Sequence, residues 1–220
     1  MAPPFALGDR PTNRRTATQP GAFFGHSERS TVYKGFTIDG GTTPSKKYSA
    51  TFLIDRSWKT FDFDFGAGPR FPRVSPNALL DPNAPLDPGL GATLDIIATF
   101  NWQSTNALRL SLNYVKSRLV RTDTDRVAYD QSLYSFRATY QFTRFTFARA
   151  RIDYDTLNAN VQSQFLAGWT PNPGTAFYIG YDDDLNRNGY NPFTNQYEPG
   201  FIRNGRTFFV KISYLIRRNL

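Results

Sequence analysis

A two-residue alternation of apolar and polar side chains is the feature that most limits what this chain can fold into. In LGATLDIIATFNWQ, residues 90–103, every second residue from Leu90 to Trp102 is apolar, and Ile97 is the one large apolar residue on the other face. A helix would scatter these apolar residues around its whole surface, whereas a β-strand places them on one side. The segment therefore predicts a single long strand with an apolar and a polar face.

The same alternation recurs in residues 108–114, 134–143, 148–155 and 207–217. These segments extend over roughly nine to fourteen residues, whereas strands of globular proteins usually have about five or six, and a tilted strand crosses a bilayer in about nine to eleven. Their polar faces carry charges of both signs, which a water-filled lumen solvates and the core of a sandwich does not. We therefore predict an all-β fold: an antiparallel transmembrane β-barrel of about ten strands, or an incomplete part of a larger barrel.

The predicted connections alternate in length, as in outer-membrane barrels with short periplasmic turns and longer external loops. Residues 104–107, 143–144 and 171–174 predict short turns, a modest break is predicted at 158–159, and residues 120–131 and 185–206 predict long loops. With the C-terminus on the periplasmic side, every long loop lies outside the cell. The predicted location is therefore the bacterial outer membrane.

The N-terminal part of the chain predicts three further strands, in residues 30–39, 47–56 and 59–68, with a turn at 56–59. Residues 69–89 contain six prolines and predict a long external loop or a plug-like excursion. We predict an irregular segment over residues 1–29 and a barrel domain over residues 30–220.

Composition removes several classes of function. The 220-residue chain has no cysteine, which excludes disulfides, thiolate metal sites and Cys nucleophiles. It has one histidine, His26, so any His-based site would have to use that residue alone. The net charge is +8, but the basic residues are spread along alternating faces, so we predict no nucleic-acid partner. The sequence has no run of about 18 apolar residues, so it predicts no transmembrane helix. Residues 1–15 lack the apolar stretch of a signal peptide.

Three runs in the C-terminal half resemble a known family of bacterial barrels: YQFTRFTFARARIDYD, QFLAGWTPNPGTAFYIGYDDDLNRNGYNPF and EPGFIRNGRTFFVKISYLIRR. GPRFPRVSP and DPNAPLDPG resemble it as well, so the resemblance extends over residues 60–220. The family is the C-terminal domain catalogued as domain of unknown function 5916. The resemblance implies an outer-membrane barrel that follows a secretory signal and a family-9-like carbohydrate-binding module. It therefore implies a link to glycans at the cell surface, and it transfers no catalytic residue.

Charged side chains on the predicted polar faces form the first candidate site, which is either a polar pore or a charge-paired ladder that fills a small barrel. These lumen-facing candidates are Arg137, Arg149, Arg151, Asp153, Lys211 and Arg217. Asp153 and Asp155 also have the form of a paired-carboxylate hydrolase site. The neighbouring arginines favour structural ion pairing instead.

The stretch D-L-N-R-N-G, residues 184–189, supplies the first, third and fifth oxygen ligands and the glycine of a calcium loop. The candidate calcium ligands are Asp182, Asp184, Asn186 and Asn188. Asn195 stands where an EF-hand requires glutamate, and the flanking segments predict strands, so a full EF-hand is excluded. The alternative is an external loop built from turn-forming residues.

Tyr190, Phe193 and Tyr197 lie in the same predicted loop and could either stack on sugar rings or pack the loop onto the barrel rim. We therefore expect a membrane anchor or porin-like element of a surface protein linked to carbohydrate binding. Its expected partners are outer-membrane lipid and, through an upstream module, carbohydrate; calcium is the one candidate cofactor. The alternatives are an outer-membrane hydrolase with its site in external loops and a soluble β-sandwich binding module.

Overall fold

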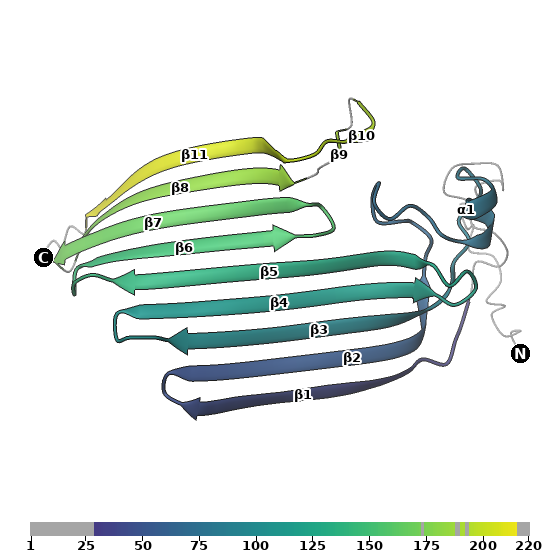
Figure 1. Ribbon diagram of the computed structural model, residues 1–220, viewed down its shortest axis with the longest axis horizontal. Coiled ribbons are helices and arrows are strands. Elements are labelled where there is room, and N and C mark those ends of the chain that lie inside the picture. Colours follow the sequence, from purple (N-terminus) through teal and green to yellow (C-terminus); the bar gives the residue numbers. More distant parts are fainter. Residues whose placement is uncertain (1–28, 173, 188–189, 192–193, 215–220) are drawn as a thin grey trace, which may run out of the picture.

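The computed structural model describes residues 29–172, 174–187, 190–191 and 194–214. Within these ranges the chain forms one nine-stranded antiparallel sheet, in the order β1-β2-β3-β4-β5-β6-β7-β8-β11, and a separate two-stranded hairpin (Figure 1). The strands of the sheet are β1 (Lys34–Ser45), β2 (Tyr48–Asp62), β3 (Gly89–Gln103), β4 (Leu108–Arg121), β5 (Val127–Gln141), β6 (Thr146–Asp155), β7 (Asn160–Asn172), β8 (Thr175–Arg187) and β11 (Phe201–Tyr214). The hairpin pairs β9 (Tyr190–Asn191) with β10 (Gln196–Tyr197), and one short helix, α1 (Pro76–Leu80), lies between β2 and β3.

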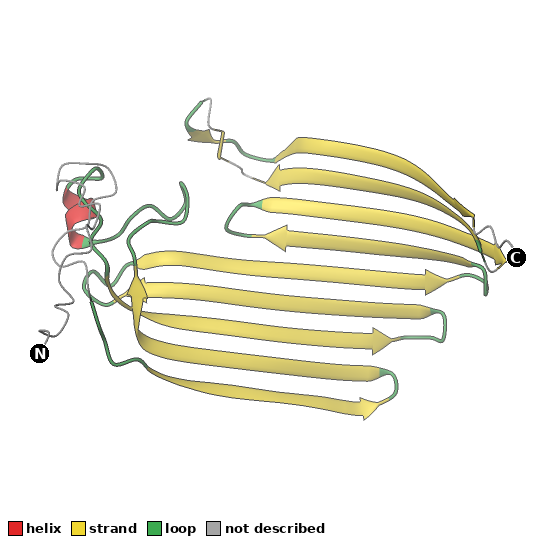
Figure 2. Ribbon diagram, turned by 180° about the vertical axis from the view of Figure 1, so that it is seen from behind, coloured by secondary structure: helices red, strands yellow, loops and turns green. Residues whose placement is uncertain are grey.

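The described strands form a single curved layer whose edges, β1 and β11, lie on opposite sides and do not meet (Figures 1 and 2). The fold is thus all-β and antiparallel, as the alternation predicts, and the sheet is open within the described residues. No described helix has the length and apolar character needed to cross a membrane. The predicted irregular segment, residues 1–29, lies outside the described residues except for Arg29.

The two faces of the sheet follow from its register, because directly opposed residues of neighbouring strands point to the same side. One such row of opposed residues is apolar and contains Ala50, Phe100, Leu112, Phe136 and Ile152. The adjacent row is polar and contains Ser49, Asn101, Ser111, Arg137 and Arg151. We call these sides the apolar face and the polar face.

The two ends of the strands also differ. At one end, which we call the turn end, residues 46–47, 104–107, 142–145 and 173–174 connect consecutive strands. At the other end, the loop end, the connections are residues 63–88, 122–126, 156–159 and 188–200. The described chain therefore alternates shorter connections at one end with mostly longer ones at the other.

Two of the three strands predicted in the N-terminal part are one strand. The predicted turn at residues 56–59 is wrong, because β2 continues through it to Asp62. Trp58 pairs with Ala92 and Thr60 with Gly91, so Lys59 is an extra residue held at a positive φ of 62°. This is a β-bulge, which bends a strand without ending it. The described sheet therefore has nine strands where about ten were expected.

Two predicted loops are shorter than expected. Residues 120–131 lack a clean alternation, yet only residues 122–126 connect β4 to β5. Lys116 and Arg118 both approach Asp130 across the strand pair, at 2.6 Å and 3.7 Å, and this pairing keeps the polar sequence in the sheet. Similarly, β8 continues to Arg187 and β11 begins at Phe201, so the loop predicted over 185–206 is residues 188–200 and contains the β9–β10 hairpin.

Candidate functional site

The apolar face carries an uncharged band that is bordered by two rows of aromatic side chains. On the loop side, Tyr114, Tyr134 and Tyr154 oppose one another, with ring centroids 5.0 Å and 6.2 Å apart. The aromatic side chains on the turn side are Tyr48, Trp102, Tyr140, Phe142, Trp169, Phe177 and Tyr214. Tyr134 and Tyr140 are six residues apart on β5, which is about 20 Å of strand. In the middle of the sheet, over β4, β5 and β6, the two rows therefore enclose a band of about this height.

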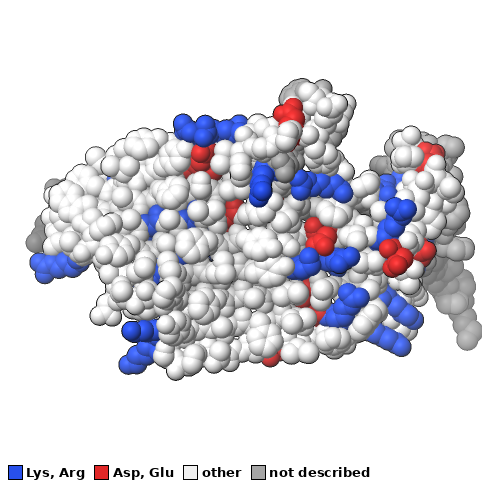
Figure 3. Space-filling model, viewed as in Figure 1, with Lys and Arg blue, Asp and Glu red and all other residues white. Residues whose placement is uncertain are grey.

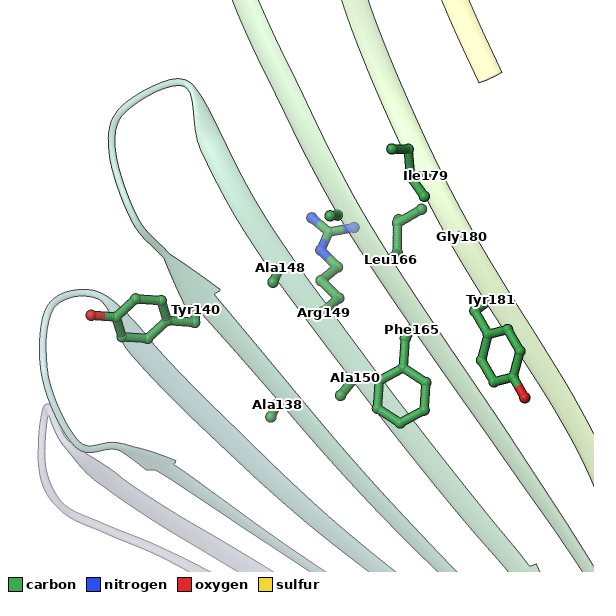
Figure 4. A pocket seen from close by; sticks show the side chains of 11 residues that line it. Ala138, Tyr140, Ala148, Arg149, Ala150, Phe165, Leu166, Ile179, Gly180 and Tyr181 are labelled. Atoms are coloured by element: carbon green, nitrogen blue, oxygen red, sulfur yellow. The ribbon is translucent and has the colours of Figure 1, made fainter. Parts of the chain in front are cut away.

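The band itself is exposed. Phe208 and Ile212 of β11 each expose 66% of their surface, and Leu112 in the middle of the sheet exposes 47%. A hollow of about 350 Å³ lies within the band, where Ala138, Ala148 and Ala150 leave room between large rings (Figure 4). No second layer of the described chain covers this face.

The charged residues of the apolar face all lie at the loop end, beyond the band. They are Lys34, Arg56, Lys116, Arg118, Asp130, Asp183, Arg187, Arg203 and Arg206. Asp183 receives hydrogen bonds of 2.9 Å from both Arg203 and the hydroxyl of Tyr181, so part of this border is ion-paired. In the view of Figure 3, most of the visible charged side chains lie toward the loop end.

The polar face sorts its charges by sign along the strands. Except for Arg121, which is buried at the loop end, the basic residues lie within five residues of the turn end of their strands: Arg109, Arg137, Arg149, Arg151 and Lys211. The carboxylates lie farther along toward the loop end: Asp39, Asp55, Asp95, Asp153, Asp155, Asp182 and Asp184. The polar face is therefore positive near the turns and negative toward the loops.

The carboxylates of the polar face are mostly hydrogen-bonded to neutral neighbours. Asp95 accepts a bond of 2.5 Å from Ser117, and Asp184 accepts one of 2.5 Å from Asn160. Asp155 accepts from Gln131 at 3.1 Å and from Asn158 at 2.6 Å. These hydrogen bonds fix the carboxylates within the sheet. Asp155, one of the two carboxylates of the hydrolase hypothesis, is among those fixed in this way.

Residues 63–88, which we call the cap loop, fold over the loop end of the polar face. Val74 of the cap loop is buried against Leu119 and Ala128, and Tyr129 packs against this cluster. Leu119 and Tyr129 are opposed residues of β4 and β5 on the polar face. At its other extremity, Arg70 donates a hydrogen bond of 3.1 Å to the backbone oxygen of Thr156 after β6. The cap loop therefore reaches across the loop end from β4 to the β6–β7 connection.

Two buried ionic groups hold the cap loop. Asp64, whose side chain is fully buried, accepts a bond of 2.6 Å from Arg73 and one of 3.0 Å from the backbone of Asp87. Arg121 is also fully buried and donates to Asp123 at 2.6 Å, to Asp62 at 3.1 Å and to the backbone oxygen of Asp87 at 2.9 Å. The hydrogen bonds from Arg121 lower the pKa of Asp123 below its ordinary value.

The structure places most of the predicted lumen residues on one face. Arg137, Arg149, Arg151, Asp153 and Lys211 all lie on the polar face, and Arg151 pairs with Asp153 at 2.5 Å. Arg217 lies outside the described residues.

The calcium candidates do not form a loop. Asp182, Asp184 and Asn186 lie on β8, and the prediction that a loop begins here is wrong. In a strand their side chains project in parallel at intervals of about 6.6 Å rather than converging on one ion. Asn188 lies outside the described residues, and no described cluster of three or more His, Cys, Asp or Glu side chains could hold a metal ion.

The candidate sugar-stacking residues lie at the β9–β10 hairpin. The backbone of Tyr197 pairs with that of Tyr190. The Arg70 guanidinium of the cap loop lies 5.5 Å from the ring centroid of Tyr197, so this ring packs on the cap loop. Phe193 lies outside the described residues, as does the side chain of Tyr190.

Sequence reasoning missed the residues that anchor the cap loop. Arg73 lies in a proline-rich stretch with no periodicity, and Asp64 takes a positive φ of 62° that no local pattern predicts. Arg121 sits at the end of a strand, where an exposed charge is the usual expectation. Only the alternation of β4 could have indicated that Arg109 belongs with the other basic residues of the polar face.

Comparison of the chain with protein-family models, with curated proteins and with solved structures finds no match. The resemblance to the domain of unknown function 5916 family therefore remains a prediction that rests on the sequence runs quoted above.

Proposed function

We propose that this chain is part of a bacterial outer-membrane β-barrel in which the apolar face meets lipid and the polar face lines the interior. The observation that carries the proposal is the exposed, uncharged band between two aromatic rows. A band about 25 Å tall with aromatic borders is characteristic of lipid-facing barrel walls. Exposing this much contiguous apolar surface to water is unfavourable, and monomeric soluble proteins expose apolar patches of only a few hundred Å².

The strand lengths and connections support the same proposal. Strands of 10 to 15 residues are long enough to cross a bilayer at a tilt. Barrels of this kind have their short turns on the periplasmic side, so the turn end is periplasmic and the loop end, with its cap loop and charged border, is external. The C-terminal strand β11 runs toward the turn end, which puts the C-terminus on the periplasmic side.

An open sheet cannot persist in lipid, because unpaired backbone groups at its edges cost several kcal/mol each. In the proposed barrel, the outer edges of β1 and β11 are paired by further strands, which a second copy supplies when the chain is refolded alone. The polar face then lines a cavity, and the chain acts as the wall of an anchor or porin-like element. We extend the proposal to a surface protein linked to carbohydrate binding on the strength of the family resemblance alone.

The three tryptophans provide a direct test. All lie on the apolar face: Trp102 and Trp169 at the turn-side border of the band, and Trp58 beyond the band toward the loop end. After refolding of the full chain into phosphatidylcholine vesicles, we expect the protein to float with the vesicles in a density gradient. We also expect lipids that are brominated near the headgroup to quench the tryptophan emission. A matched control replaces Ser111 on the polar face with tryptophan in a background with all three native tryptophans changed to phenylalanine. This single tryptophan should escape quenching.

Three outcomes would contradict the proposal. These are a chain that stays monomeric in the aqueous phase without detergent, native tryptophans that brominated lipid does not quench, and equal quenching of the tryptophan at position 111.

A further inference from the structure

Four arginines of the polar face converge on one patch near the turn end. Arg137 on β5 is directly opposite Arg151 on β6, which places their Cβ atoms about 5 Å apart. Arg109 on β4 and Arg149 on β6 oppose Thr139 of β5 from its two sides. Their long side chains can therefore reach a common ligand above the three strands.

The positive charge of this patch is largely uncompensated. Asp153 pairs with Arg151, and the Arg149 guanidinium lies 4.7 Å from the ring centroid of Phe147. Within the described part of the chain, the side chains of Arg109 and Arg137 form no hydrogen bond or ion pair. Like charges in directly opposed positions destabilise a sheet, so an arrangement that keeps them together is explained by a bound counter-charge.

A groove of about 570 Å³ lies beside this patch, and we call it the basic groove. Its cations are Lys46 and Lys47 of the β1–β2 turn together with Arg109 and Arg137. The other polar residues of its lining are neutral: Thr43, Ser49, Asn101, Gln103, Ser111 and Thr139. Tyr48, Trp102 and Leu110 of the apolar face border it at the turn end. No carboxylate lines it, although the polar face carries several nearer the loop end. Its volume is within the range of small-molecule sites.

A second groove continues from the first. It has a volume of about 480 Å³, shares Arg137 and Thr139 with the basic groove, and adds Arg149, Arg151 and Gln164 to the lining. Asp182 is the one carboxylate at its border. The two grooves thus form one path with cations along its length and neutral hydrogen-bonding groups between them.

We propose that the basic groove binds a small solute that carries two or more phosphate, sulfate or carboxylate groups. Guanidinium groups bind such oxyanions through two parallel hydrogen bonds, and the neutral amides and hydroxyls can bind further oxygens of the same solute. This inference rests on the proposed function, because only in the proposed barrel does the polar face line the interior. It names polyanionic solutes as the class held at the periplasmic half of that interior.

The test uses the full chain in a neutral detergent, with inorganic tripolyphosphate as the probe and titration calorimetry as the readout. We expect saturable binding that weakens at least tenfold in Arg137→Gln and that weakens with added salt, because the attraction is ionic. Arg56→Gln is the matched control: this arginine lies on the apolar face at the loop end, beside Trp58, and its loss should leave binding unchanged.

Lys46→Gln/Lys47→Gln provides a second test if Arg137→Gln does not fold, because both lysines lie in or beside an exposed turn. This variant should also weaken binding several-fold. Absence of saturable binding at millimolar tripolyphosphate would overturn the proposal, and so would equal binding by Arg56→Gln and the groove variants.

Anionic lipid is distinguished by a separate arm. The chain in phosphatidylcholine nanodiscs and the chain in nanodiscs containing phosphatidylglycerol should bind tripolyphosphate with the same affinity. Weaker binding in the presence of the anionic lipid would show that the groove faces lipid headgroups, and it would overturn the proposal of a bound solute. The inference and the proposed function fail separately. Insertion into vesicles without tripolyphosphate binding refutes only the inference, and binding by a chain that does not insert refutes the barrel.

Discussion

The two ends of the polar face treat their charges in opposite ways. At the loop end, Arg121 and Asp64 are fully buried under the cap loop. Each forms an ion pair and a hydrogen bond with the backbone of Asp87. At the turn end, Arg109, Arg137 and Lys211 are exposed and have no ion-pair partner among the described residues. Charges of the loop end are matched within the protein, and those of the turn end are not.

This difference separates structure from binding. A buried charge that loses its partner is strongly destabilising, so every ion under the cap loop must be compensated internally. An exposed, unmatched cluster contributes little to stability and is free to take its counter-charge from solution. We therefore expect substitutions at the loop end to change folding, and substitutions at the turn end to change ligand affinity.

The largest effect is expected for Arg121→Met. The substitution leaves Asp62 and Asp123 without their cation under the cap loop, which should lower the free energy of unfolding by roughly 3–5 kcal/mol. The measurement is urea unfolding in detergent, monitored by tryptophan fluorescence. Lys211→Met at the turn end is the control and should change the unfolding free energy by less than about 0.5 kcal/mol. Equal effects would remove the distinction between the two ends.

A local effect is expected for Arg73→Gln. Asp64 would keep a buried carboxylate without its guanidinium partner, so the cap loop should open more often while the sheet remains folded. Limited proteolysis within residues 63–88 should accelerate roughly tenfold for each 1.4 kcal/mol of lost local stability. Leu80→Ser, at a position of α1 that is 88% exposed, is the control and should be cleaved at the native rate. Unchanged cleavage of Arg73→Gln would show that the ion pair does not hold the loop.

Acid should affect the two ends differently. The pKa of Asp123 is lowered in the folded chain because Arg121 donates hydrogen bonds to its carboxylate. A group with a depressed folded pKa contributes stability above its unfolded pKa of about 4, and this contribution is lost as the pH falls through the lower folded value. Proteolysis of the cap loop by an acid-active protease should therefore increase below about pH 4. Arg121→Met should largely remove this dependence, and the arginines of the turn end should add none, since arginine does not titrate there.

The smallest effect on stability, and one of opposite sign, is expected for Arg137→Gln. Removing one member of the opposed Arg137–Arg151 pair should raise the unfolding free energy by roughly 0.2–1 kcal/mol in the absence of anions. Asp153→Asn removes the counter-charge of Arg151 and should instead strengthen tripolyphosphate binding. A clear loss of stability in Arg137→Gln would mean that the basic cluster is a structural element.

Much of the fold could be predicted from the sequence because alternation is local. Residues 90–103 carry their apolar face in plain view, and the structure forms β3 over nearly the same residues. The errors occurred where a long-range contact overrides the local pattern. The predicted turn at residues 56–59 is a bulge because β3 continues to pair on both sides of Lys59, and the loop at 120–131 is mostly strand because Asp130 has basic partners across the pair.

The candidate site was only partly accessible in the same way. Alternation assigned Arg149, Arg151 and Asp153 to one side of a strand, but no property of β6 alone indicates what lies opposite them. The calcium motif at residues 184–189 was misleading because turn-forming residues can also extend a strand when a neighbouring strand pairs with them. Here β8 continues to Arg187, and the side chain of Asn160 on β7 donates a hydrogen bond to Asp184.

The sequence by itself determined that this chain is a set of long, two-faced strands and which side chains share each face, because a period of two depends only on backbone geometry. The tertiary structure decided the register, and the register decides function here. It set Arg137 opposite Arg151, aligned the tyrosines of β4, β5 and β6 into one row, and brought the cap loop onto the polar face. Such pairings join segments far apart in the chain, so they follow from the free energy of the whole sheet rather than from any local pattern.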